Sequence, residues 1–284
     1  MAQNSDRSVG GENGGPGLAL RQLRALGLEG GEPTLELLTQ IVRRQVAVFA
    51  FSSMGVRLNE PLPLEPEQLF DRIVVRRRGG YCFEHNGLLF AVLSELGYDV
   101  TIRLARVINN GDHLPPLTHR IAHVCIDDVT YVVDAGFGPA GPAVPVAMPM
   151  PGESTPAQWL GDRPHRVIER RPGEFHMQQR QVGGPFSLYR FDLGTYGQAD
   201  CELGHFYSHR HPQAVFVNNL VASRILDTEI RSLRNHSYRV LRAKGHVDTE
   251  IREADHLGSV LRDDFELHVT NDEARRLFAG LPAR

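Results

Sequence analysis

The chain has 284 residues, 41% of them hydrophobic, which is enough to bury one large core or two to three small ones. Its 31 basic and 34 acidic residues leave a net charge of −3, so neither nucleic acid nor an anionic membrane is an expected partner. Residues 1–17 lack the apolar stretch of a secretory signal, and no apolar run is long enough to span a bilayer. We therefore expect a cytoplasmic protein.

Residues 1–17 predict a disordered tail, because they offer almost no apolar surface to offset the entropy of ordering. The part that follows is typical of helices, since apolar residues recur at helical spacing and Gly or Pro marks the ends. The expected helices span 18–28, closed by Gly30 and Gly31, then 33–46, 65–75 and 81–96, closed by Gly97.

The hydrophobic period changes to alternation after Gly97, which predicts strands. Expected strands span 100–104, 121–126, 131–134, 166–169, 174–182 and 186–191. Beyond residue 200 the signals mix, with a strand over 237–241 and a helical end over 270–278. This order favours an α+β fold with segments at 18–98, 99–200 and 201–284.

Three cysteines, Cys82, Cys125 and Cys201, are too few and too widely spaced for a disulfide framework or a zinc site. Free thiols suit a reducing compartment, where one of them can act as a nucleophile. His205, His209 and His211 lie close together in sequence, but their spacing matches no known set of metal ligands. We expect no metal.

Cys82 follows two glycines and opens a predicted helix. The glycines allow the loop to approach a ligand closely, and the N-terminus of the helix favours a thiolate. The unpaired N–H groups there could also hold the oxyanion of a tetrahedral intermediate. The alternative interpretation is a small buried cysteine at the start of a helix.

A nucleophilic cysteine needs a base and a group that orients the base, and the predicted hairpin over 119–134 supplies both. His119 and His123 share one face of its first strand, and Asp134 ends the second strand. A two-residue turn at 127–128 places Asp134 opposite Ile121, diagonal to both histidines. The hairpin alone therefore permits either histidine as the base.

The stretch Arg-Gly-Gly-Tyr-Cys-Phe-Glu-His-Asn over 78–86 resembles the active-site signature of the arylamine N-acetyltransferases. Residues 133–138 and 211–223 resemble two further hallmarks of that family, and the likeness runs from about residue 18 to 278. The resemblance implies a triad of Cys82, His119 and Asp134. It also implies that Phe137, Gly138 and Arg78 contact substrate.

In this family the fold combines an N-terminal helical bundle, a β-barrel-like middle domain and a C-terminal α/β lid, around a core like that of papain and the transglutaminases. The resemblance implies ping-pong transfer of an acetyl group from acetyl-CoA, through a thioester on the cysteine, to an arylamine or hydrazine nitrogen. Acetyl-CoA is then a co-substrate, and no cofactor is bound permanently. Alternatives are an amide synthase acting on a polyketide chain, a hydrolase with the same triad, and a binding module without activity.

The chain departs from the family at two positions. The family usually has Pro-Phe-Glu-Asn-Leu after its second helix, where this chain has Ala50-Phe51-Ser52-Ser53-Met54. The first helix usually carries an arginine where this chain has Ala25. Because this Glu and this Arg normally accompany the signature arginine, the surroundings of Arg78 must be rebuilt.

Overall fold

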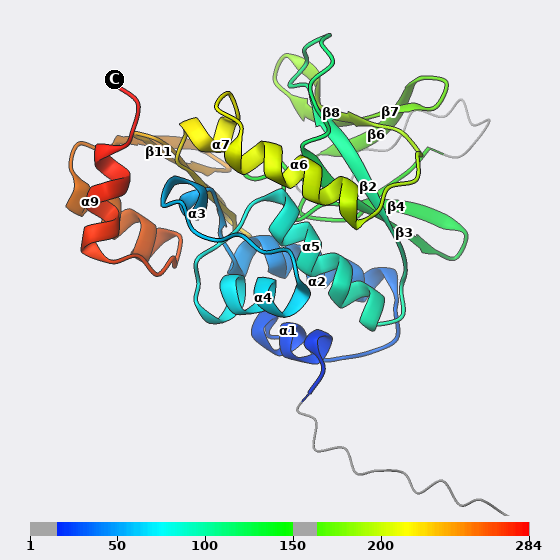
Figure 1. Cartoon of the computed structure of the whole chain (residues 1–284). Coiled ribbons are helices and arrows are strands. Elements are labelled where there is room, and N and C mark those ends of the chain that lie inside the picture. Colours follow the sequence, from blue (N-terminus) through cyan, green and yellow to red (C-terminus); the bar gives the residue numbers. More distant parts are fainter. Residues whose placement is uncertain (1–15, 150–163, 284) are drawn as a thin grey trace, which may run out of the picture.

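Helices form the first part of the molecule and gather around the central helix α5 (Figure 1). The structure, a computed structural model, describes residues 16–149 and 164–283. In this part the elements are α1 (Leu18–Leu26), α2 (Leu35–Val48), α3 (Met54–Arg57), α4 (Pro66–Phe70), the π-helical turn η1 (Asp71–Val75) and α5 (Cys82–Glu95). Of the tail predicted over 1–17, residues 1–15 lie outside the described residues.

The helix ends follow local chemistry. Thr34 caps α2 by accepting a hydrogen bond from the Leu37 N–H, and Gly97 ends the α5 region with φ 85°. The prediction that Gly30 and Gly31 close the first helix is wrong. Gly27 closes it instead, because its φ of 70° fits the left-handed cap that glycine favours.

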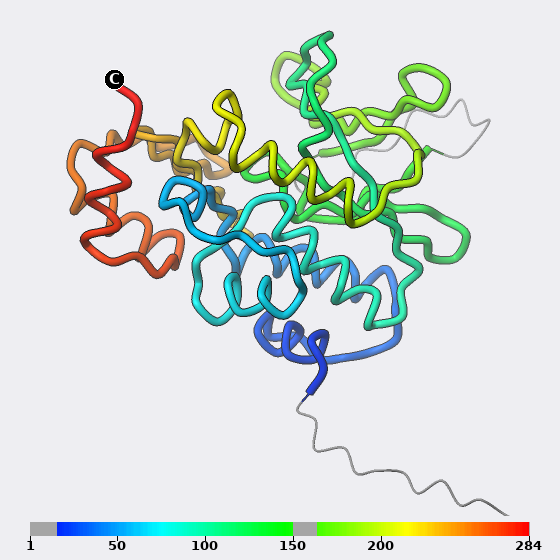
Figure 2. The backbone as a smooth tube through the Cα atoms, in the orientation of Figure 1, coloured from blue at the N-terminus to red at the C-terminus, as the bar shows by residue number. Residues whose placement is uncertain are grey.

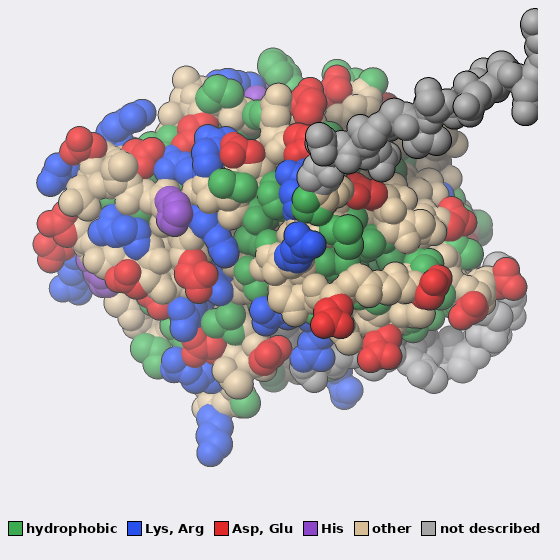
Figure 3. Space-filling model, turned by 90° about the horizontal axis from the view of Figure 1, so that it is seen from below, with side chains coloured by type: hydrophobic (Ala, Val, Ile, Leu, Met, Phe, Trp, Pro, Cys, Tyr) green, Lys and Arg blue, Asp and Glu red, His purple; other side chains and the backbone are tan. Residues whose placement is uncertain are grey.

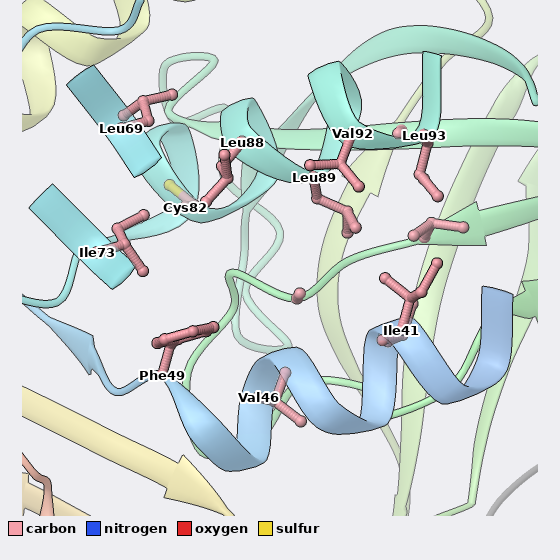
Figure 4. Close-up of a cluster of buried hydrophobic side chains, with 14 of the residues drawn as sticks. Ile41, Val46, Phe49, Leu69, Ile73, Cys82, Leu88, Leu89, Val92 and Leu93 are labelled. Atoms are coloured by element: carbon pink, nitrogen blue, oxygen red, sulfur yellow. The ribbon is translucent and has the colours of Figure 1, made fainter. Parts of the chain in front are cut away.

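The main core lies between α2 and α5 (Figure 4). Ile41 and Val46 of α2 face Leu89 and Val92 of α5 across it, and Cys82 lies at the start of α5. All residues from Cys82 to Leu89 are buried, so the first two turns of α5 are enclosed on every side rather than amphipathic. A helix so enclosed has little freedom to shift, which fixes the position of its first residue.

A seven-stranded antiparallel sheet forms the middle part, in the order β5-β4-β3-β2-β8-β7-β6. It curls so far that its edge strands β5 and β6 meet, which makes it nearly a barrel with an apolar interior. Its strands are β2 (Asp99–Val107), β3 (His119–Ile126), β4 (Val129–Val133), β5 (Val146–Ala147), β6 (His165–Arg171), β7 (Glu174–Gln181) and β8 (Gly184–Phe191). The predicted turn at 127–128 is confirmed, and both of its aspartates have positive φ.

The last part holds a five-stranded antiparallel sheet in the order β1-β9-β10-β11-β12. Its strand β1 (Phe51–Ser52) comes from the helical part and pairs with β9, so segments far apart in sequence run side by side (Figure 2). The other elements are α6 (Gln198–Arg210), α7 (Val215–Asn218), β9 (Val221–Ile225), β10 (Glu229–Arg234), β11 (Ser237–Arg242), β12 (Gly245–Glu250), α8 (Ala254–Ser259), the π-helical turn η2 (Val260–Asp264) and α9 (Asn271–Ala279).

The predicted α+β class and the order of helical, β and mixed parts are confirmed. The sequence did not indicate α6, which crosses above α5 and spans the segment boundary expected at residue 200 (Figure 1). The strands β10 and β12 were also not expected.

Charge of both signs is spread over the face of the molecule seen in Figure 3, with apolar side chains between. The longest helices in the described ranges, α2 and α5, have 14 residues each, or about 21 Å at the usual rise per residue. Within those ranges no helix combines the length and apolar character that crossing a membrane requires.

Candidate active site

Cys82 begins α5, as the sequence predicts, and its side chain is only 3% exposed. Its Sγ lies 3.4 Å from the carbonyl oxygen of Thr118, the residue before β3. In the first helical turn the Glu84 and His85 N–H groups donate to the Tyr81 carbonyl, and the first N–H groups of a helix have no acceptor one turn earlier. Cys82 therefore lies at the positive end of the α5 dipole.

His119 begins β3 and reaches the carboxylate of Asp134, which follows β4. Its Nε2 lies 2.7 Å from Asp134 Oδ2. The pairing of Ala122 with Val133 fixes a register in which Asp134 stands opposite Ile121, as predicted. Because Nε2 faces Asp134, Nδ1 is the ring nitrogen left for Cys82.

Charge couples the three groups. Burial by itself lowers the pKa of His119, but the charge of Asp134, the hydrogen bond to it and the contact with Cys82 raise it to about 10. Burial opposes the ionisation of Asp134, yet His119 and the hydrogen bonds hold the pKa of this carboxyl below its usual range. A protonated His119 beside an ionised Asp134 is therefore the favoured state of this pair.

Asn86 joins the helix to both strands, a role that the sequence analysis did not assign. It lies one turn after Cys82, and its Nδ2 donates to Asp134 Oδ1 at 2.9 Å and to the Arg120 carbonyl at 2.6 Å. Its Oδ1 accepts from the Ala135 N–H at 2.9 Å. Its spacing of four residues from Cys82 is the signal that could have found it, because i and i+4 share a helix face.

Gly136 leaves the space that this assembly needs. A Cβ at this position would lie 2.7 Å from Cys82 Cα and 2.8 Å from Asn86 Nδ2. Its N–H donates to Asp134 Oδ1 at 2.9 Å. The turn after β4 can therefore lie directly against the start of α5 only because this residue has no side chain.

Aromatic rings form the barrel side of the site. The ring centroids of Phe137 and Tyr189 lie 5.2 and 4.9 Å from that of His119. Tyr189 is fully buried, and burial followed by the Asp134 charge raises its pKa well above the usual value. Its hydroxyl makes no hydrogen bond of normal geometry, so it adds a dipole beside Asp134 that the sequence analysis did not foresee.

Two adjoining cavities meet at Ile225. A narrow one of about 10 Å³ is lined by Asp134, Phe137 and Gly138, which leaves room for about one water. A larger one of about 300 Å³ lies between α2, the loop at 143–144 and the C-terminal sheet, and Arg43 and Arg242 border it. As it stands, the narrow cavity beside Asp134 is too small for a substrate.

The other predicted histidine, His123, does not join the triad. Its ring meets the edge of Phe191 at a centroid distance of 5.5 Å, and its Nε2 is buried without a hydrogen-bond partner. Burial, helped by Arg103, lowers its pKa to about 3. His123 is thus a neutral residue of the barrel interior.

A family model described as N-acetyltransferase matches residues 34–274, and the arylamine N-acetyltransferase of Mycobacterium tuberculosis is 33% identical over 84% of this chain and 85% of that protein. This chain belongs to the arylamine N-acetyltransferase family. The solved structure of the Salmonella typhimurium enzyme is 26% identical with a TM-score of 0.84, covering 93% of this chain and 98% of that one. That of the Mycobacterium marinum enzyme in complex with CoA is 28% identical with a TM-score of 0.83, covering 91% and 98%.

Arg78 of the family signature lines neither of these two cavities but borders a separate open hollow of about 590 Å³ beside residues 266–270, and its contact with substrate stays a prediction. Its guanidinium is 12% exposed and engages Glu60, Glu273 and the His268 carbonyl. The structure thus brings Phe137 and Gly138 to the triad but directs Arg78 elsewhere.

The histidines of α6 serve packing in this family member. His205 Nδ1 lies 2.6 Å from the Tyr81 hydroxyl, and its Nε2 lies 2.7 Å from the Leu62 carbonyl oxygen. His209 Nδ1 bonds the His205 carbonyl at 2.7 Å. Within 16–149 and 164–283, no three His, Cys, Asp or Glu side chains gather as they would around a metal ion.

Proposed function

We propose that this chain transfers an acetyl group from acetyl-CoA to an arylamine or hydrazine nitrogen by a ping-pong mechanism through a thioester on Cys82. The contact of His119 Nε2 with Asp134 at 2.7 Å, beside a cysteine at a helix N-terminus, carries the proposal. Its relatives support it by name, and the Mycobacterium marinum enzyme binds CoA. The amide synthase alternative gains nothing from these relatives.

In the first half-reaction the Cys82 thiolate attacks the carbonyl carbon of acetyl-CoA. N–H groups at the start of α5 stabilise the oxyanion, and the carbon–sulfur bond to CoA then breaks. The His119 imidazolium gives its proton to the departing CoA sulfur. Cys82 is left as an acetyl thioester beside a neutral His119.

In the second half-reaction the amine nitrogen attacks this thioester. His119 takes the proton of the amine, the amide leaves, and the Cys82 thiolate returns. Asp134 holds the imidazole in orientation and stabilises its charge throughout. A thioester is reactive enough that a weakly basic aromatic amine suffices.

The two cavities suit a two-stage reaction. The cavity of about 300 Å³ lies where the barrel meets the C-terminal sheet, and its arginines Arg43 and Arg242 could face the phosphates of CoA. The narrow cavity beside Phe137 would then admit the acetyl end and later the aromatic amine. We infer that both substrates approach Cys82 past Ile225, which lines both cavities.

Mass spectrometry tests the thioester directly. After acetyl-CoA is added without an amine, we expect one acetyl group on the peptide that contains Cys82. A limiting pulse of iodoacetamide should label Cys82 first, and acetyl-CoA should protect it.

Two further results would decide the assignment. Cys82→Ser should lose the adduct and nearly all transfer, because an alcohol stays protonated where the thiol ionises. Burial, with a smaller effect from Asp200 and Glu202, raises the pKa of Cys201, so this thiol should react slowly. An adduct on Cys125 or Cys201, or transfer by Cys82→Ser at a comparable rate, would contradict the mechanism.

A further inference from the structure

A chain of ion pairs surrounds the loop that carries Cys82. Glu60 uses both carboxylate oxygens, one on Arg78 and the other on Arg72 Nη1 at 2.5 Å. Arg72 Nε then lies 2.7 Å from Glu84 Oε1, with the geometry of an ion pair rather than of a linear hydrogen bond. Arg78 also meets Glu273 at 2.8 Å, so Glu60 links charges on both sides of Cys82.

The inner members of this chain are buried. The Arg72 and Glu84 side chains are 2% and 1% exposed, whereas Glu60 is 20% exposed. Burial raises the pKa of Glu84, and Arg72 opposes that rise. Because a buried charge without a partner is strongly unfavourable, moving any one member disturbs the next.

Within the loop, Tyr81 is anchored through its hydroxyl to His205, whereas the two glycines before it have no such anchor. Gly79 and Gly80 carry no side chains, and Gly79 has a φ of 65°. The backbone contacts of the loop include Ser52 N–H to the Gly80 carbonyl at 2.6 Å and Tyr81 N–H to Glu84 Oε2 at 3.1 Å. The second of these depends on where Glu84 is placed.

Gly55 leaves the room that the ion pairs occupy. A Cβ there would lie 1.9 Å from Arg72 Nη2 and 3.0 Å from Glu60 Oε2. Its φ is not in the left-handed region, so the need for glycine here comes from space rather than from backbone conformation. Residue 55 therefore has no side chain at the place where Arg72 approaches Glu60.

We propose that Glu60 is a positioning residue for Cys82. Its carboxylate binds Arg78, which precedes Cys82, and Arg72, which in turn binds Glu84, two residues after Cys82. These contacts fix the loop of Cys82 so that the sulfur lies against His119. The position that usually carries glutamate is Ser52 here, so Glu60 supplies the carboxylate from eight residues further on. This role deepens the proposed acetyl transfer and rests on it.

The same series of ion pairs connects the loop of Cys82 to the C-terminal part of the molecule. Glu273 lies in the first turn of α9, where its carboxylate also accepts the Thr270 N–H at 2.8 Å. Arg78 bonds the His268 carbonyl just before that helix. The loop of Cys82 is therefore held between Glu60 on one side and the start of α9 on the other.

Glu60→Gln tests the proposal, with Glu174→Gln as a matched control. Glu174 also contacts two basic residues, Arg190 and His176, both at 3.2 Å, and is 27% exposed. It lies on β7, outside the ion pairs around Cys82. Both variants would be checked for folding by circular dichroism and thermal melting before any rate is measured.

The first readout is iodoacetamide labelling of the Cys82 peptide over a pH series, which needs no acetyl transfer. If Cys82 shifts away from His119 in Glu60→Gln, the midpoint of labelling moves to higher pH. If only a charge is lost, Arg72 and Arg78 are left uncompensated and the midpoint moves to lower pH. The sign therefore separates positioning from a through-space charge effect.

The second readout is the rate at which acetyl-CoA acetylates Cys82. We expect a fall of about tenfold to a hundredfold in Glu60→Gln, little change in the KM for the amine, and no change of either readout in Glu174→Gln. A folded Glu60→Gln whose labelling midpoint is unchanged or lowered overturns the proposal.

If Glu60→Gln does not fold, Glu273→Gln takes its place. It removes the charge of Glu273 from Arg78 and should raise the pH midpoint of labelling, by less than Glu60→Gln would. A midpoint that is unchanged or lowered overturns the proposal. The two proposals fail separately. Absence of an acetyl adduct in the unmodified protein would contradict the proposed acetyl transfer. The iodoacetamide labelling of Glu60→Gln and Glu174→Gln would still measure the effect of Glu60 on Cys82.

Discussion

His119 and His123 lie four residues apart on the same face of β3, yet their surroundings favour opposite protonation states. Asp134 and Cys82 raise the pKa of His119 to about 10, whereas burial lowers that of His123 to about 3. Both are diagonal to Asp134 in a flat drawing of the hairpin. Because the strands twist, the distances from Asp134 to the two histidines differ, and sequence spacing alone could not show which histidine is nearer.

Alanine at each histidine separates their roles. His119→Ala should slow formation of the acetyl-enzyme by about 10²- to 10⁴-fold, the usual loss when a general base is removed. His123→Ala should keep the rate and lose about 1–3 kcal/mol of stability, as other buried truncations do. Single-turnover acetylation and urea unfolding measure the two effects. An inactive His123→Ala beside an active His119→Ala would reverse the assignment.

The helix α6 shows why one element escaped prediction. Its buried positions are Cys201, Gly204, His205 and Ser208, which have perfect helical spacing but are small or polar. Its exposed positions include Leu203 at 72% and Phe206 at 64%. A search for an apolar stripe therefore selects the wrong face. Here tertiary contacts, not apolar burial alone, decide which face turns inward.

Gly204 allows α6 to lie against the site, and its substitution tests that contact. A Cβ there would lie 2.5 Å from the Leu117 carbonyl oxygen and 2.6 Å from Phe83 Cζ. Since neither neighbour can easily move, Gly204→Ala should lower the free energy of unfolding by about 1–3 kcal/mol.

The control for this helix contact is Gly31→Ala, at a residue with no atom within 4 Å of the added Cβ. It should change stability by less than about 0.5 kcal/mol. Urea unfolding of both variants gives the comparison. Equal stabilities would mean that α6 does not need this close approach.

Elements with strong local signals could be predicted: α5 from its apolar run, and the β3–β4 hairpin from alternation and its Asp-Asp turn. The cysteine, both histidines and the aspartate came from the same signals. Asn86 was missed although its spacing of four residues from Cys82 could have marked it. Tyr189 and Glu60 could not be placed, because each acts on a residue distant in sequence. Nothing local distinguishes such side chains from solvated ones.

At the scale of the whole molecule the three predicted segments are interlocked. Strand β1 of the helical part extends the C-terminal sheet. Arg57 of the helical part donates to the Val217 and Gly280 carbonyls, and Arg224 of β9 reaches back to the Ala47 carbonyl. A two-residue strand and arginines that bond distant backbone carbonyls leave no sequence pattern, so this interlocking appears only in three dimensions. We infer that the described parts unfold together.

Three buried neutral histidines spread over these parts make the fold sensitive to acid. Burial lowers the pKa of His85 to about 4, that of His123 to about 3 and that of His205 to about 4. His85 joins α5 to the Ala50 carbonyl, and His205 joins α6 to the Leu62 carbonyl. In the unfolded chain each would titrate near pH 6.5.

The direction of the pH effect follows from proton binding. Between about pH 6.5 and 4 the unfolded chain binds protons that the folded chain does not, so stability falls as the pH falls. His119 acts differently: its raised pKa gives stability that is complete below about pH 6.5 and is lost as the pH rises toward 10. The lowered pKa of Asp134 matters only below about pH 4.

We therefore expect acid destabilisation that one substitution can reduce. When the pH falls from 6.5 to 5, each neutral histidine lowers the free energy of unfolding by about 2 kcal/mol, at about 1.4 kcal/mol per pH unit. Three of them approach the total stability of a typical domain. His123→Phe should reduce this acid-induced loss of unfolding free energy by about 2 kcal/mol, because it removes a group that binds a proton only in the unfolded chain. The substitution breaks no hydrogen bond of Nε2, which has no partner. Urea unfolding at both pH values measures the difference, and an unchanged loss would mean that His123 is protonated in the folded state.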